Sequence, residues 1–150
     1  MSISSNNPHP TTAMMYSKSD LRNLTYKING AAIEVHKHLG PGLLESIYHE
    51  CMKHELRLRG LNFLSEMNIP IHYKGINMAT NLRCDLYVEE CIIVELKSVK
   101  AVEPYDEAKL MTYMKLLNAP KGIMFNFNVA QLYPDGQKTY INQLFNDLVE

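Results

Sequence analysis

The chain has 150 residues, of which 46% are hydrophobic and 21% charged, a composition typical of a globular domain. A chain of this length can hold a core without disulfides or a structural metal, and its three cysteines fit neither a disulfide framework nor a Cys-x-x-Cys site. Fifteen Lys and Arg against sixteen Asp and Glu give a formal charge of -1, which argues against binding nucleic acid through bulk positive charge. We expect a cytoplasmic protein, because no segment has the composition of a membrane span or a secretory signal.

The first part of the chain predicts a tail followed by a helix. Residues 1–18 are rich in Ser, Asn, Pro and Thr, so we expect a flexible N-terminal tail before a single domain over residues 19–150. Apolar residues spaced three or four apart then predict a helix over residues 19–39, opened by a capping box of Ser17 and Asp20. Gly40-Pro41 is expected to end it.

A second helix is predicted directly after this break, with Pro41 in its first turn and its end near Arg59. Gly42, Glu45 and Tyr48 are spaced by three and would share roughly one face of it. Glu45 would then lie beside core-facing positions. Taken alone, it is more simply a solvated residue at the edge of the apolar stripe.

Later segments predict strands and one further helix. Residues 61–66 and 69–73 are short β-rich runs with a turn at Lys74-Gly75, and residues 78–88 with 91–99 resemble a hairpin. A helix over residues 103–117 should cover the sheet, and residues 121–128 form a buried strand reached by a crossover. A turn at residues 133–136 and a short strand at 138–141 complete the domain.

Charged residues within the predicted hairpin point to chemistry. Glu95 and Lys97 lie two apart on one face of an apolar strand, where charge is costly unless it is paired or bound to a ligand. A two-residue turn at Glu89-Glu90 would make Asp85 point away from Glu95. We therefore predict a three-residue loop over residues 89–91, or a bulge, which places Asp85 directly opposite Glu95.

Two opposed carboxylates and a backbone carbonyl offer hard oxygen ligands for Mg²⁺ or Mn²⁺, and a nearby lysine can orient the attacking water or stabilise negative charge. This combination suits metal-assisted phosphodiester hydrolysis. By itself, an Asp followed by Glu-x-Lys is also compatible with a cross-strand ion pair. The six histidines lack the spacing of helical zinc sites.

Several ordered motifs give the chain a family resemblance. They are residues 36–48 (HKHLGPGLLESIY), 83–89 (RCDLYVE), 93–99 (IVELKSV), 107–113 (EAKLMTY) and 126–128 (NFN). Together they closely resemble the GxxExxY family of the PD-(D/E)xK superfamily over about residues 20–142. The resemblance implies an α/β, restriction-endonuclease-like fold, with a central mixed sheet of four to five strands flanked by helices in the order α-α-β-β-β-α-β.

The resemblance also implies a site, with Asp85 and Glu95 as metal-site acids, Glu45 contributed by a helix and Lys97 as the catalytic lysine. One departure concerns the run that follows. Family members usually carry His-Glu-Ala-Gln where this chain has Asp106-Glu107-Ala108-Lys109. Lys109, with Tyr113 one helical turn on, can contact a phosphate or form an ion pair with the metal-site acids.

Our first hypothesis is an Mg²⁺- or Mn²⁺-dependent nuclease acting on DNA or RNA. The metal ligands would be Asp85, Glu95 and the backbone carbonyl of Leu96, joined by Glu45 as a third acid, with Lys97 at the water or phosphate. Supporting roles would fall to Lys109, Tyr113 and Tyr48.

The alternative is a nuclease fold without turnover that binds nucleic acid or a protein. The lysines among residues 97–121 either flank a cleft for the nucleic-acid backbone or form a solvated face. No membrane partner is expected, and the sequence does not indicate whether the protein is a homo-oligomer.

Overall fold

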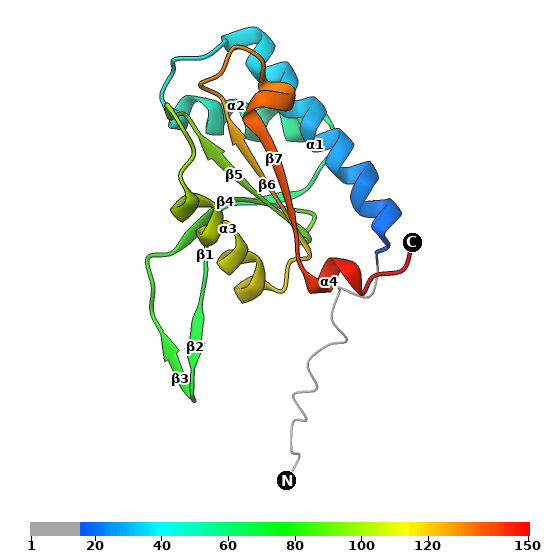
Figure 1. The fold of residues 1–150 in the computed structure, drawn as a ribbon, viewed down its shortest axis with the longest axis vertical. Coiled ribbons are helices and arrows are strands. Elements are labelled where there is room, and N and C mark those ends of the chain that lie inside the picture. Colours follow the sequence, from blue (N-terminus) through cyan, green and yellow to red (C-terminus); the bar gives the residue numbers. More distant parts are fainter. Residues whose placement is uncertain (1–15) are drawn as a thin grey trace.

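The computed structural model describes residues 16–150 as a five-stranded sheet covered by helices on both faces (Figure 1). The α-helices are α1 (Lys18–Leu39), α2 (Glu45–Leu58), α3 (Pro104–Leu117) and α4 (Gln143–Asn146), and a short π-helical segment, η2 (Leu132–Gly136), lies where a turn was predicted. The sheet has the order β1 (Phe63–Asn68), β4 (Arg83–Val88), β5 (Ile92–Lys97), β6 (Lys121–Asn126) and β7 (Gln137–Ile141). A separate two-stranded sheet joins β2 (Ile71–Tyr73) to β3 (Ile76–Met78). Only the β5–β6 pairing is parallel within these sheets, so the main sheet is mixed as predicted.

Two cores lie on opposite faces of the main sheet. Apolar side chains of α1 and α2 pack on one face, against residues such as Leu86, Val94 and Phe125. Side chains of α3 pack on the other face, against Ile93 and Met124. None of the helices within residues 16–150 is long and apolar enough to cross a bilayer.

The predicted first helix is confirmed as α1. Ser17 and Asp20 form the expected capping box, in which the backbone N–H of each donates to the side chain of the other. Of the predicted tail, residues 1–15 lie outside the described part of the chain, and Lys18 already belongs to α1.

The predicted start of the second helix is wrong, because α2 begins at Glu45 and not near Pro41. Gly40 and Gly42 adopt positive φ angles of 68° and 95°, a conformation that a right-handed helix cannot contain. Gly42 therefore precedes the helix and does not share a helical face with Glu45 and Tyr48.

The strand predicted over residues 78–88 is divided in the structure. Met78 ends β3 in the separate hairpin, and β4 begins only at Arg83. The Lys74-Gly75 turn joins β2 to β3 as expected. The predicted helix over residues 103–117 and the strands near residues 121–128 and 138–141 are confirmed as α3, β6 and β7, whereas the short α4 was not predicted.

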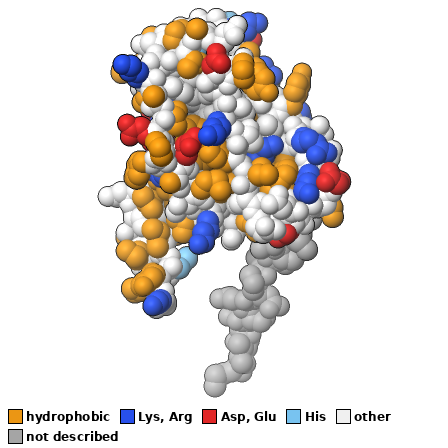
Figure 2. Space-filling view, viewed as in Figure 1, with side chains coloured by type: hydrophobic (Ala, Val, Ile, Leu, Met, Phe, Trp, Pro, Cys, Tyr) orange, Lys and Arg blue, Asp and Glu red, His pale blue; other side chains and the backbone are white. Residues whose placement is uncertain are grey.

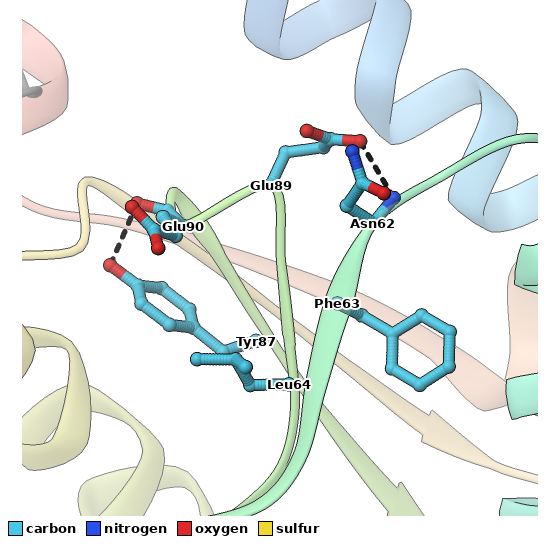
Figure 3. Close-up of a pocket in the computed structure, with 6 residues that line it drawn as sticks. All are labelled: Asn62, Phe63, Leu64, Tyr87, Glu89 and Glu90. Carbon is cyan, nitrogen blue, oxygen red and sulfur yellow. Dashed lines mark hydrogen bonds between the residues drawn. The ribbon is translucent and has the colours of Figure 1, made fainter.

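The turn between β4 and β5 has the predicted three-residue length, since Val88 pairs with Ile92. Figure 3 shows how it is held: Glu89 accepts a hydrogen bond from the backbone N–H of Asn62 (2.7 Å), and the Tyr87 hydroxyl donates to the carbonyl of Glu90 (2.8 Å). Glu89 and Glu90 thus fix the turn at one end of the hairpin, whereas Asp85 and Glu95 lie toward the other end.

Candidate functional site

Asp85 and Glu95 meet where β4 and β5 separate. The regular ladder ends at the pair Leu86–Val94, and the same register sets Asp85 opposite Glu95. Beyond that pair, hydrogen bonds between backbone N–H groups and side chains replace the backbone–backbone hydrogen bonds of the ladder. The backbone N–H of Asp85 donates to Glu95 Oε1 (3.2 Å), and the N–H of Leu96 donates to Asp85 Oδ2 (2.8 Å). The two carboxylates therefore fill the gap between the strands.

Glu95 is buried, with 4% of its surface exposed, and its surroundings disfavour its charge. Burial raises the pKa of Glu95 most, and the negative charge of Asp85 adds to this, while Lys109 acts in the opposite direction. The neighbouring Cys84 thiol shows the same field, because burial and then Glu95 and Asp85 raise its pKa to about 12. Such a cluster of acids is a place where a cation would be stabilised.

Lys97 ends β5 and forms an ion pair across to α3. Its ammonium lies 3.1 Å from Asp106 Oδ1, and both side chains are only 17% exposed. Partial burial by itself would lower the pKa of Lys97, but the hydrogen bond and charge of Asp106 outweigh it and raise the pKa overall. The second carboxylate oxygen of Asp106 accepts from the N–H of Glu103 in the cap of α3. Lys97 is therefore tied to the first turn of this helix.

Glu45 is the first residue of α2 and is exposed at its surface. Partial desolvation raises the pKa of Glu45 most, and Asp85 raises it further, while Lys97, Lys109 and His49 lower it. These influences place Glu45 within the electrostatic reach of the cluster that surrounds Asp85 and Glu95.

The loop before Glu45 is fastened to the rest of the domain by Tyr48. The buried Tyr48 hydroxyl donates to the Gly40 carbonyl (2.6 Å) and accepts from the N–H of Leu43 (3.2 Å). The Tyr48 ring stacks on Phe127, with centroids 4.4 Å apart. Ser98, directly after Lys97, donates to the Leu43 carbonyl. Gly42 therefore belongs to a turn, Tyr48 holds that turn through hydrogen bonds, and Glu45 lies between them in the sequence.

Lys109 and Tyr113 extend the cluster from α3. The Lys109 ammonium lies 5.8 Å from the centroid of the Tyr113 ring. Burial and then Glu95 raise the pKa of the Tyr113 hydroxyl. The structure thus brings Lys109 and Tyr113 to the face of the sheet on which the acids lie.

The lysines among residues 97–121, predicted either to flank a cleft or to form a solvated face, do not all lie on one surface. Lys121 begins β6 and pairs with Ile92, whereas Lys97 pairs with Asn126 at the other end of the parallel strands. These lysines are therefore distributed over the domain.

Three residues at the site had no assigned role in the sequence interpretation: Asp106, Ser98 and Asn126. The buried Asn126 side chain donates to the Val99 carbonyl (2.9 Å) and accepts from the Val99 N–H (3.1 Å), which fixes the chain after Lys97. Asp106 was recognisable only as a departure from the family run. Ser98 and Asn126 lie within the recognised motifs, but nothing in the sequence tells which backbone groups they bind.

The oxygen atoms at this site suit a hard divalent cation. Asp85 and Glu95 provide carboxylates, and the Leu96 N–H points toward Asp85, so its carbonyl is directed to the same side of the strand. Mg²⁺ and Mn²⁺ prefer such oxygen ligands and retain several waters. Within residues 16–150, no three His, Cys, Asp or Glu side chains lie together as a metal-binding group, so a cation here would depend on two carboxylates, the carbonyl and water.

Comparison with known proteins identifies a family. No curated protein and no solved structure matches the chain significantly. The family model described as the PD-(D/E)XK nuclease superfamily matches residues 22–139, which include Asp85, Glu95 and Lys97. The five-stranded mixed sheet flanked by helices is consistent with the restriction-endonuclease-like fold. The chain therefore belongs to the PD-(D/E)XK nuclease superfamily.

Proposed function

We propose that this protein is a metal-dependent nuclease that hydrolyses phosphodiester bonds in DNA or RNA. The observation that carries the proposal is the pair of Asp85 and Glu95 at the opening between β4 and β5, with Lys97 two residues further along β5. The buried carboxyl of Glu95 is costly to the fold unless it is protonated, paired or bound to a ligand, and membership of a nuclease superfamily suggests a ligand. We further assign the chain to the GxxExxY group, because Tyr48 anchors the loop from which Glu45 begins α2.

Each residue has a distinct role in this proposal. Asp85, Glu95 and the Leu96 carbonyl would hold Mg²⁺ or Mn²⁺, with Glu45 acting on the cation through a bound water. When bound, the cation supplies a Lewis acid for the phosphate and lowers the pKa of water. Lys97 orients the attacking water or stabilises the charge that develops on the phosphate. Lys109 offers a second cation for a phosphate oxygen, and the Tyr113 ring, whose centroid is 5.8 Å from the Lys109 ammonium, supports Lys109.

One observation favours a second candidate, a nuclease fold that binds nucleic acid or a protein without cleaving it. Lys109 already supplies positive charge that acts on Glu95. An ammonium in that position can offset the carboxylates and reduce their affinity for a cation. The two candidates differ in whether the protein cleaves the phosphodiester bond of a nucleic acid.

Cleavage assays with Mn²⁺ separate them. Single- and double-stranded DNA and RNA are incubated with the wild-type protein, Asp85→Asn and Lys97→Ala, and with the control variants Asp135→Asn and Lys37→Ala, which alter exposed residues outside the site. We expect each site variant to lose activity by a factor of about 100 or more, while the controls retain it. Activity that survives both site substitutions would overturn the assignment. Mn²⁺ binding that depends on Asp85, without any cleavage, would favour the second candidate.

A further inference from the structure

The hairpin of β2 and β3 projects from the body of the protein as a separate arm (Figure 1). Tyr73 pairs with Ile76 around Lys74 and Gly75, whose φ angles of 43° and 85° are both positive. Two such residues form the tight turn that matches the twist of a two-stranded ribbon. Residues 72–79 are all exposed. The arm is therefore an ordered ribbon with nothing packed around its tip.

The base of this arm is fixed to the domain. Ile69 is fully buried in the core beneath α3, and its N–H donates to the Leu82 carbonyl (2.8 Å). The Thr80 hydroxyl donates to the Ile69 carbonyl (2.7 Å). These hydrogen bonds join the two segments of the ribbon where they leave the main sheet, so the fold sets the direction of the arm.

The arm leaves the sheet at the end that carries the candidate site. Asn68 and Arg83 form the last pair of β1 and β4, and Asp85 lies two residues further along β4, a distance of roughly 7 Å along a strand. β5 is antiparallel to β4, so Lys97, the last residue of β5, lies at the same end of the sheet as the start of β4. A ligand that contacts the base of the arm would therefore lie beside the candidate site.

The surface of the arm is apolar on one face and free of negative charge. Cross-strand pairing places Ile71 with Met78 and Tyr73 with Ile76 on one face, and the last three of these are 48%, 56% and 59% exposed, respectively. His72 and Asn77 occupy the other face and are hydrogen-bonded to each other. Residues 67–84 contain Lys74 and Arg83 but no Asp or Glu, although the whole chain has a net charge of -1. Figure 2 shows hydrophobic side chains along the arm and a basic one at its tip.

We propose that the β2–β3 arm enters a groove of double-stranded DNA beside the bond that the site cleaves. This inference rests on the proposed function and names its substrate class. The major groove of B-DNA, about 12 Å wide, admits a two-stranded ribbon, whereas the major groove of A-form RNA is too narrow for side chains to read. Lys74 contacts a phosphate, and exposed Tyr73, Ile76 and Met78 supply apolar contacts to base edges in that groove, such as the thymine methyl group.

A second copy of the chain is a less suitable occupant. A stable protein interface buries about 800 Å² on each partner, and four apolar side chains on a narrow ribbon fall well short of that area. An arm without acids near a nuclease site is also the charge arrangement that a phosphate backbone requires, whereas self-association gains nothing from it.

The test compares two identical sequence changes at different places. Tyr73-Lys74 at the tip of the arm and Tyr26-Lys27 on the outer surface of α1 are both exposed Tyr-Lys pairs. The double variants Tyr73→Ser/Lys74→Glu and Tyr26→Ser/Lys27→Glu therefore have the same composition. Binding to a fluorescent 20-base-pair DNA duplex, to its single strand and to the matching RNA duplex is measured by anisotropy in EDTA at two salt concentrations.

We expect the arm variant to bind the DNA duplex at least about 10-fold more weakly and to lower the salt dependence of binding by about one counterion, while the α1 variant changes affinity less than about twofold. Single-stranded DNA and RNA duplex should be affected less than the DNA duplex. Equal losses in the two variants, or no duplex binding by the wild type, would overturn the proposal. So would a wild-type dimer that the arm variant converts to a monomer in light scattering.

Cleavage assays separate this inference from the proposed function. If the wild type and the arm variant cleave duplex DNA with the same KM and kcat, the site is a nuclease and the arm inference is wrong. If duplex binding depends on the arm but no protein cleaves any substrate with Mn²⁺, the arm inference is upheld and the proposed nuclease activity is wrong.

Discussion

Glu95 is a carboxyl group buried in β5 beside a second carboxylate, and this arrangement makes stability depend on pH. Burial and the charge of Asp85 raise the pKa of Glu95 from 4.5 to about 8. The folded state therefore holds a proton that the unfolded state releases, so the free energy of unfolding falls as pH rises from about 4.5 to about 8. Glu95→Gln removes this ionisation.

We predict that, in EDTA, the Glu95→Gln variant gains stability over the wild type as pH rises from 5 to 8, by on the order of 1 to 3 kcal/mol. Urea unfolding at several pH values measures the difference. Glu90→Gln, in the exposed turn at the other end of the hairpin, is the control and should follow the wild type at each pH. Parallel stability curves for Glu95→Gln and the wild type would contradict the prediction.

For single residues, the sequence predicted the cross-strand register of the hairpin, which follows from the length of its turn. The three-residue turn set Asp85 opposite Glu95 because side chains alternate along a strand. The ion pair between Lys97 and Asp106 was not predictable in the same way. It depends on where the chain after β5 turns into α3, and the pattern of residues 103–117 specifies a helix without specifying its distance from Lys97.

Among the elements, α2 depends on the anchor of the loop before it. The buried Tyr48 hydroxyl satisfies two backbone groups of residues 40–43, so removing it leaves those groups without a partner. We predict that Tyr48→Phe lowers the free energy of unfolding by about 1 to 2 kcal/mol while keeping the stack on Phe127. Chemical denaturation measures this loss. Tyr26→Phe, at a position with 81% exposure, should leave stability unchanged.

The same variant tests whether the loop positions Glu45. If it does, Tyr48→Phe reduces cleavage in the wild-type background and has a much smaller effect when Glu45 has already been changed to Gln. Equal effects in the two backgrounds would show that Tyr48 acts on stability alone.

Sequence periodicity predicted both long helices, but it misplaced the start of α2. The spacing of apolar residues does not reveal the positive φ angles of Gly40 and Gly42.

At the scale of the whole molecule, the crossover from β5 through α3 to β6 assembles the site from separate parts of the chain. It was predictable because the apolar strands over residues 92–97 and 121–126 flank a helix, and a helical crossover is the connection that parallel neighbours need. The separate β2–β3 sheet was not predicted as such. Short runs at residues 71–73 and 76–78 indicate strands, yet their partners are decided by the packing of Ile69 at the base of the arm.

The close approach of α3 to β6 is set by Gly122. A Cβ atom there would lie 2.8 Å from Met114 Sδ and 3.0 Å from Leu110 Cδ1, both in the core of α3. We predict that Gly122→Ala costs about 1 to 3 kcal/mol and weakens cleavage, because α3 carries Asp106, Lys109 and Tyr113 and must shift away from the sheet.

Gly30→Ala in α1 is the matched substitution. Its Cβ atom would meet only the end of the flexible Arg59 side chain, and alanine favours a helix by up to about 1 kcal/mol over glycine. We therefore expect Gly30→Ala to leave cleavage unchanged and stability equal or higher, as measured by thermal and urea unfolding. If both alanine variants behaved alike, the contact between Gly122 and α3 would not control the position of the site, and the loss of cleavage would need another cause.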